Sequence, residues 1–377
     1  MNHRSKTANL VLSGGGIKGI AYIGMFEEAE KRGISFANIS GVSAGALVGS
    51  LKGAGYNASE LKKILHEIDF GKITDKDIER RVPAVAKFRD YYYNKRPGND
   101  DAFQSFLNLG YVSLTNSLYS HSGVQLSRSR NNFLKNVIEY CKDGCLCDGD
   151  YLEELVYKEL LKKGVKTFDD LRDKMTHKSD YKYYRVRMTA VDASRAKIIV
   201  LPDDIGYYGI NPDKLEVAKA VRMSTSIPFI FKPIELYKKV GNSSNKYSIV
   251  DGGVLDNFPL WLAGTSQYHP LVGARLDGGE KKKTFSASNS LNIIKGLVSA
   301  VHDFGIPKTN IKSCIVIKIN TSKVSFLDFD LGDDEKEELI SAGRLAAAGP
   351  LDEFIGMGKG GENYMFNFIR KLIRGIF

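Results

Sequence analysis

The stretch Gly41-Val42-Ser43-Ala44-Gly45 places the tightest limit on how this chain can fold. It has the G-x-S-x-G form of a nucleophile elbow, a strained turn from a strand into a helix that exposes a serine hydroxyl. Gly41 and Gly45 are expected because the incoming strand and the outgoing helix approach too closely there for a Cβ atom. Ser43 would then lie at the N-terminus of the helix, where backbone N–H groups favour negative charge.

The residues on both sides of this turn fit a strand followed by a helix. Residues 34–40 predict a short buried strand, and the small residues at 44–49 predict a helix packed closely on a sheet. Because glycine, serine and alanine are common, a G-x-S-x-G match also occurs by chance. The function of Ser43 therefore depends on what the rest of the chain supplies.

A second glycine-rich turn, at residues 14–19, follows an apolar segment at 9–13 and precedes a predicted helix at 20–32. Its spacing matches the dinucleotide fingerprint G-x-G-x-x-G, but that site needs an acidic residue about 20 positions later. Residues 34–58 contain no Asp or Glu, which argues against a nucleotide site. A P-loop is excluded because no Gly-Lys-Ser/Thr follows the glycines.

The same glycines can instead supply backbone donors to an oxyanion. Gly15 and Gly16 carry no side chain that would shield their amides, so we expect these amides to face Ser43. Lys18 would add positive charge nearby. A tight turn that only packs the strand against the helix is the alternative interpretation.

Composition narrows the classes of partner. The 377 residues carry a formal net charge of +10, and no apolar run reaches the length of about 18 residues needed to span a membrane. The chain also begins without the apolar segment of a signal peptide, so a soluble, unprocessed protein is expected. Because no nucleic-acid motif accompanies the positive charge, peripheral contact with an anionic membrane is favoured over nucleic acid.

The four cysteines, Cys141, Cys145, Cys147 and Cys314, do not have the spacing of a zinc site or of a disulfide scaffold. Free thiols, no metal and a reducing, cytoplasmic compartment are the expectation.

Helices and strands alternate along the rest of the chain, as expected for an α/β fold. Residues 246–250 predict a strand that delivers Asp251 at its carboxyl end, just before two glycines, where open α/β sheets carry functional groups. Residues 363–377 predict a basic amphipathic helix, which either docks on the core or lies on an anionic membrane. The other predicted elements are helices at 58–68, 149–163, 216–223, 291–302 and 334–348, and strands at 183–192, 197–201, 271–276 and 314–319.

A serine nucleophile needs a base to accept its proton. Asp251 followed by His269 or His302 would complete the Ser-Asp-His order of an α/β-hydrolase triad. Neither histidine, however, follows a strand in a glycine-containing loop. His269 precedes a proline, and His302 lies within an apolar predicted helix, where a structural histidine is the more common case.

Four motifs in order, VLSGGGIKG, GVSAG, STSIPFIFKP and VDGGVLDNFP, resemble the patatin-like phospholipase family. The resemblance covers residues 8–265, matches poorly over an insertion at about 70–146, and leaves 266–377 as a C-terminal extension of the α/β core. It implies a three-layer α/β/α fold with a mostly parallel central sheet. It also implies a Ser–Asp dyad without histidine, with Ser43 as the nucleophile, Asp251 as its base, and Gly14, Gly15, Gly16 and Lys18 as the oxyanion loop.

The resemblance further implies a lipid acyl hydrolase of the phospholipase A or lysophospholipase type, without a cofactor. Asp251, taken as ionised at pH 7 from an ordinary pKa of about 3.9, would accept the Ser43 proton as an acyl-serine forms. A non-catalytic membrane-binding protein and a general carboxylesterase or acyltransferase are the alternatives. Peripheral attachment to a membrane is expected inside the cell, and secretion as an effector and an activating partner stay open.

Overall fold

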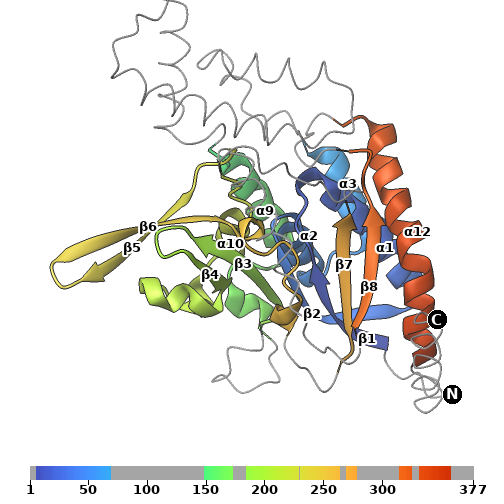
Figure 1. The fold of residues 1–377 in the computed structure, drawn as a ribbon, viewed down its shortest axis with the longest axis horizontal. Coiled ribbons are helices and arrows are strands. Elements are labelled where there is room, and N and C mark those ends of the chain that lie inside the picture. The colour runs from blue at the N-terminus through green and yellow to red at the C-terminus, as the bar shows by residue number, and fades with distance from the viewer. Residues whose placement is uncertain are drawn as a thin grey trace, which may run out of the picture.

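The computed structural model describes residues 6–68, 148–172, 184–228, 230–263, 269–277, 314–324 and 331–357. In this part of the chain, eight strands form one mixed sheet, and the neighbours β3-β2-β1-β7-β8 run parallel to one another (Figure 1). The parallel strands are β1 (Lys6–Leu12), β2 (Ile34–Val42), β3 (Val186–Asp192), β7 (Leu271–Asp277) and β8 (Cys314–Asn320). The antiparallel strands are β4 (Lys197–Leu201), β5 (Ile234–Val240) and β6 (Ser243–Asp251).

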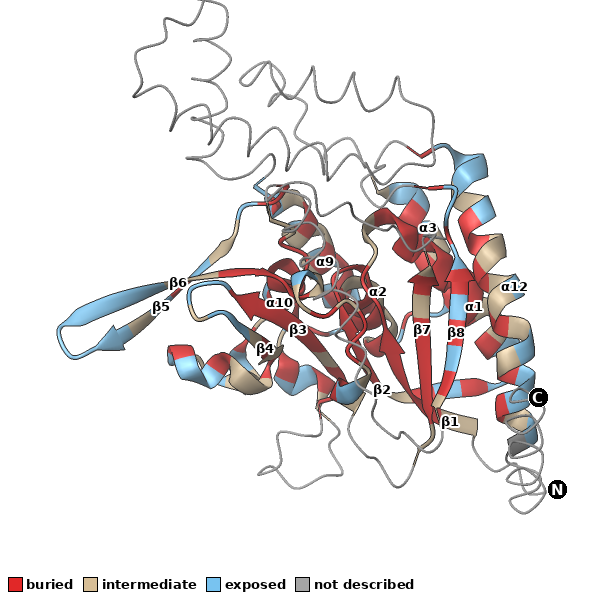
Figure 2. Ribbon diagram, in the orientation of Figure 1, coloured by how far each residue is buried: buried red, intermediate tan, exposed pale blue. Residues whose placement is uncertain are grey.

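Helices flank this sheet, and the buried residues concentrate on the parallel strands and on the helix faces turned toward them (Figure 2). Helices α1 and α12 pack side by side next to β8 (Figure 1). The helices are α1 (Ala21–Lys31), α2 (Ala44–Gly53), α3 (Ala58–Glu67), α9 (Asp150–Lys162), α10 (Val217–Ser224) and α12 (Asp333–Met357). The 3₁₀ segments are η1 (Gly16–Ile20), η3 (Phe168–Leu171), η5 (Asp203–Tyr208), η6 (Pro212–Lys214), η7 (Gly252–Val254) and η8 (Leu260–Ala263).

This arrangement confirms the expected α/β fold with a mostly parallel central sheet. Strands β7 and β8 come from the part of the chain after residue 265, and β7 pairs with β1, so that part continues the same sheet. Helix α12 runs nine residues beyond its predicted end at 348, through Pro350. Burial of Leu351 and Phe354 and the ion pair between Arg32 and Asp352 hold this added segment in place.

Several predictions fall on residues outside the described ranges. These are the insertion at 70–146, the helix at 291–302, the terminal helix at 363–377, and Cys141, Cys145 and Cys147. Cys314 is described and is a free thiol, and burial raises its pKa to about 11. Within the described ranges, no helix combines the length and the apolar character needed to cross a bilayer.

Candidate active site

Two parallel strands deliver the glycine-rich turn and the elbow to the same edge of the sheet. Strand β1 ends at Leu12, which pairs with Gly41 near the end of β2. The chain after β1 therefore runs beside Ser43. A Cβ atom on Gly14 would lie only 3.2 Å from the Ser43 Cβ atom. The two motifs therefore lie next to each other.

Ser43 occupies a strained turn between β2 and α2. Its φ of 53° lies in the left-handed region, which is uncommon for a residue with a side chain, and the residue is buried. A Cβ atom on Gly41 would lie 2.6 Å from the carbonyl carbon and oxygen of Gly45, which confirms the predicted crowding between strand and helix. For Gly45 the expected neighbour was wrong: a Cβ atom there would meet the Leu12 carbonyl oxygen at 2.5 Å, so β1 sets the requirement for glycine.

Asp251 reaches Ser43 by an unexpected route. Strand β6 runs antiparallel to β3, so its carboxyl end does not belong to the row of parallel strand ends on which the prediction relied. The hairpin of β5 and β6 extends away from the sheet, and only the last three residues of β6, 249–251, pair with β3 (Figure 1). Their partners, 190–192, are the last three residues of β3. Asp251 therefore still lies at the end of the sheet where the parallel strands finish and where Ser43 is found.

Strands β2 and β6 share one edge of β3. Residues 188–189 pair with both β2 and β4, and residues 190–192 pair with both β6 and β4. Because β4 occupies one edge of β3 from residue 188 to residue 192, β2 and β6 must both lie on the other edge. Val42 pairs with Thr189 and Asp251 with Ala190, so the two strands end head to head at adjacent positions.

The Ser43 and Asp251 side chains meet at this junction. The Asp251 carboxylate accepts hydrogen bonds from the Ser43 hydroxyl and, at 2.7 Å, from the Gly253 N–H, and both lower its pKa. Burial has the larger effect and raises the pKa of Asp251 from 3.8 to about 7. The expectation of a fully ionised Asp251 at pH 7 was therefore wrong, because an ordinary pKa assumes a solvated carboxylate.

The glycine-rich turn lies beside Ser43, and its backbone amides differ in whether they already have a partner. The Gly14 N–H donates to the Asn257 carbonyl oxygen at 3.0 Å and is used there. Within the described part of the chain, the amides of Gly15 and Gly16 donate no hydrogen bond at the start of η1. Lys18 is buried within η1, and its N–H donates to the Gly15 carbonyl oxygen.

Neither described histidine faces Ser43. His269 precedes β7 at its N-terminal end, and Pro270 next to it accepts a hydrogen bond from the Asn9 N–H. Because β1 and β7 are parallel, His269 lies at the N-terminal end of the parallel strands, whereas Ser43 lies at their C-terminal end. His66 lies near Asp333 at the end of α3, and His302 lies outside the described residues. No group of metal-binding side chains occurs in the described ranges.

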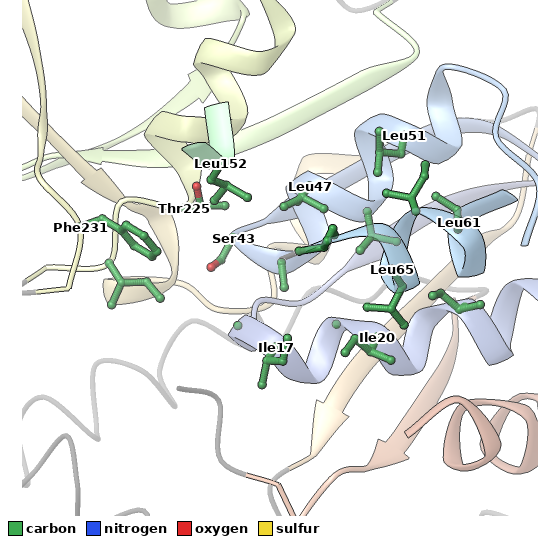
Figure 3. Close-up of a pocket in the computed structure, with 18 residues that line it drawn as sticks. Ile17, Ile20, Ser43, Leu47, Leu51, Leu61, Leu65, Leu152, Thr225 and Phe231 are labelled. Atoms are coloured by element: carbon green, nitrogen blue, oxygen red, sulfur yellow. The ribbon is translucent and has the colours of Figure 1, made fainter. Parts of the chain in front are cut away.

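An apolar pocket opens beside Ser43. Among the described residues that line it, Ser43 and Thr225 are the only ones with a polar side chain. Figure 3 shows Thr225 and Phe231 on one side of Ser43 and the leucines of α2 and α3 on the other. The apolar lining side chains are Ile17, Ile20, Ile23, Ala44, Leu47, Val48, Leu51, Leu61, Ile64, Leu65, Ile68, Leu152, Ile227 and Phe231.

Sequence reasoning missed this pocket and one polar residue of the site. The apolar face of α3 reads as an ordinary core face, because nothing in its pattern shows that a cavity lies against it. From the sequence, Ser224 was interpreted as the end of the predicted helix at 216–223 and as part of the STSIPFIFKP motif. In the structure its hydroxyl accepts a hydrogen bond from the Ser43 N–H at 3.0 Å.

Comparison with known proteins agrees with the motifs. The family described as patatin-like phospholipase matches residues 10–263. The uncharacterized protein YqhO of Bacillus subtilis is 30% identical over 338 residues, which are 89% of this chain and 94% of YqhO. Lysophospholipase NTE1 of Scheffersomyces stipitis is 28% identical over 182 residues, 43% of this chain but 11% of NTE1.

Two solved structures were also compared. The crystal structure of VipD from Legionella pneumophila gives a TM-score of 0.43 at 18% identity, covering 93% of this chain and 67% of VipD. ExoU of Pseudomonas aeruginosa, solved in complex with SpcU, gives 0.41 at 18% identity, covering 93% of this chain and 53% of the matched one. The match over residues 10–263, which is more than half of the chain, shows that this chain belongs to the patatin-like phospholipase family.

Proposed function

We propose that this protein is a serine-dependent lipid acyl hydrolase that cleaves fatty-acyl esters of phospholipids or lysophospholipids. The observation that carries the proposal is the contact between the Ser43 hydroxyl and the buried Asp251 carboxylate at the wall of an apolar pocket. A fatty-acyl chain is the chemical group that such a pocket favours, because the described residues of its lining offer almost no polar partner. The family membership and the name of the NTE1 relative support the same class of substrate.

The reaction begins with proton transfer from Ser43. Ionised Asp251 accepts the hydroxyl proton while Oγ attacks the ester carbonyl carbon. The Gly15 and Gly16 amides donate to the oxyanion that forms. As this intermediate collapses, Asp251 returns the proton to the leaving alcohol oxygen and an acyl-serine remains. Water then attacks the acyl-serine and gives its proton to Asp251, which passes it to Ser43 as the fatty acid leaves.

A comparison of wild type with Ser43→Ala tests the proposal. Both proteins are incubated with mixed phosphatidylcholine and phosphatidylglycerol vesicles, and released fatty acid is measured by mass spectrometry. Wild type is expected to release fatty acid, and Ser43→Ala to lose at least about 1,000-fold in rate. Ser50→Ala is a matched control, because Ser50 on α2 is also buried and its hydroxyl donates to the Ala46 carbonyl without touching Ser43 in the described structure. Release that survives Ser43→Ala contradicts the proposal.

A soluble ester separates the alternatives. If the protein is a general carboxylesterase, p-nitrophenyl butyrate is turned over and vesicles are not. A non-catalytic membrane-binding protein turns over neither, and its Ser43 does not react with a fluorophosphonate probe. The proposed lipid hydrolase requires turnover of vesicle lipid and labelling at Ser43.

We also propose that the protein reaches its substrate by peripheral contact with an anionic membrane. The net charge of +10 supports this, since acidic headgroups attract a basic protein. Cosedimentation with phosphatidylglycerol vesicles is expected to exceed that with phosphatidylcholine vesicles, and to weaken as salt rises from 0.05 to about 0.5 M because exposed charges are screened. Equal binding to both vesicles would contradict this part of the proposal.

A further inference from the structure

The Ser224 hydroxyl lies between two backbone groups that would otherwise bond to each other. The Ile39 N–H donates to the Arg185 carbonyl at 2.8 Å, which fixes the phase of the parallel ladder between β2 and β3. In a regular parallel ladder the bonds recur every two residues. The next bonds would therefore join the Gly41 N–H to the Arg187 carbonyl and the Ser43 N–H to the Thr189 carbonyl.

At the last of these positions, the Ser224 hydroxyl connects the two backbone groups. The Ser224 Oγ accepts from the Ser43 N–H at 3.0 Å and donates to the Thr189 carbonyl oxygen at 2.7 Å. The Ser224 and Thr189 side chains are fully buried, and Ser43 is nearly so. The hydroxyl therefore hydrogen-bonds to both backbone groups at the point where β2 ends.

The segment that carries Ser224 also holds the second member of the dyad. Ser224 ends α10, and two residues later the Ser226 carbonyl oxygen accepts the Asp251 N–H at 2.9 Å. One short segment thus fixes the backbone of the proposed nucleophile and of its base. The Ser226 Oγ in turn accepts from the buried guanidinium of Arg222, which limits movement of the segment.

We propose that Ser224 is a positioning residue that keeps Ser43 in its strained, reactive conformation. Without the hydroxyl, the Ser43 N–H and the Thr189 carbonyl would each lose a close hydrogen-bond partner in a dry region, which is costly. The turn can relieve this cost by forming the ladder bond directly. That movement draws Ser43 into regular strand geometry and carries its Oγ away from Asp251. The inference rests on the proposed function, because it assumes that Ser43 is the nucleophile.

The test compares Ser224→Ala with Ser50→Ala in the full-length protein. Each variant loses a buried hydroxyl, but only Ser224 touches the elbow. The rate of fluorophosphonate labelling at Ser43 is measured together with kcat and KM on p-nitrophenyl butyrate and with Tm. Ser224→Ala is expected to label at least 10-fold more slowly and to lose kcat by a similar factor at unchanged KM. Ser50→Ala is expected to stay within twofold of wild type in both.

The measurements distinguish failure of the Ser224 proposal from failure of the proposed function. If wild type is not labelled at Ser43, the proposed function fails. If wild type is labelled and Ser224→Ala matches Ser50→Ala within twofold, the inference alone is overturned. If Ser224→Ala does not fold, Ser224→Cys replaces it, because a thiol keeps the volume but is a weak acceptor. Labelling of Ser224→Cys at the wild-type rate then overturns the inference.

Discussion

Asp251 meets Ser43 because strands β2 and β6 approach one edge of β3 from opposite directions and stop at its adjacent residues, Thr189 and Ala190. The carboxylate is consequently enclosed by the ends of two strands and has little access to water. Its neighbours are the Ser43 hydroxyl and the Gly253 amide, which offset only part of the lost hydration.

The rate should depend on pH through Asp251. Only the ionised carboxylate can accept the Ser43 proton, so activity is expected to rise with pH up to a pKa of about 7 and to level off above it. At pH 5 the rate should be about 100-fold below the plateau, since it falls about tenfold per pH unit. The measurement is kcat/KM on a soluble short-chain ester from pH 5 to 9, which avoids changes in lipid charge. An inflection near pH 4 would show that Asp251 is well solvated.

Asp251→Asn should abolish activity and stabilise the protein at alkaline pH. The pKa of Asp251 is higher in the folded state than in the unfolded chain, so its stabilising contribution is complete below about pH 4 and is lost as pH rises through about 7. At about 1.4 kcal/mol per pKa unit, the rise from 3.8 to about 7 corresponds to a cost of about 4 kcal/mol at pH 8. Asparagine carries no charge and removes this cost.

Urea unfolding of wild type and Asp251→Asn at pH 5 and pH 8 measures the effect. The gain in free energy of unfolding should be larger at pH 8 than at pH 5. Asp169→Asn, which changes an exposed carboxylate in η3, serves as the control and should show no such gain. A variant that is destabilised equally at both pH values would mean that Asp251 contributes packing rather than a strained charge.

The sequence was sufficient for those parts of the site that are local in the chain. The strand, glycine turn and helix at 9–32, and the strand, elbow and helix at 34–53, each carry their own glycine and apolar signals. The prediction placed Asp251 at the correct end of the sheet, but it assumed that the strand before Asp251 runs parallel to its neighbours. Strand β6 is antiparallel to β3, and its direction could not be read from its own residues. Strand β5, with mostly exposed residues, gave no pattern that would have predicted the hairpin.

The pKa of Asp251 and the position of Ser224 could not have been predicted in the same way. Burial of a carboxylate is set by everything that packs around it, and a strand-end aspartate before two glycines is as easily solvated as enclosed. The Ser224 hydroxyl binds the Ser43 and Thr189 backbone groups, which belong to two other elements, so its position cannot be predicted from the residues around it in the chain. The sequence also could not show that the Gly14 amide donates to the Asn257 carbonyl, which leaves Gly15 and Gly16 as the proposed oxyanion donors.

Gly41→Ala should disrupt the elbow. The added methyl group would lie 2.6 Å from the Gly45 carbonyl, which is backbone at the start of α2 and cannot rotate away. We expect a loss of about 2 kcal/mol or more in the free energy of unfolding and a large drop in fluorophosphonate labelling of the folded protein. Gly206→Ala should change neither, because no described residue beyond its own chain neighbours and helix backbone lies within 4 Å of the new Cβ. Wild-type labelling by Gly41→Ala would show that helix α2 can shift without moving Ser43.

Chain-length preference should change when the pocket is filled away from Ser43. Leu65 on α3 lines the pocket among the leucines that Figure 3 places beyond Leu47, and tryptophan there would occupy space that a long acyl chain needs. For Leu65→Trp we expect the ratio of kcat/KM on a p-nitrophenyl palmitate substrate to that on the butyrate ester to fall at least about 10-fold, while the butyrate rate stays near wild type. Leu345→Trp is the control, because Leu345 is 82% exposed on α12. Since overpacking costs about 1–3 kcal/mol, Tm is measured alongside. An unchanged ratio in a folded Leu65→Trp would mean that the acyl chain leaves Ser43 in another direction, past Thr225 and Phe231.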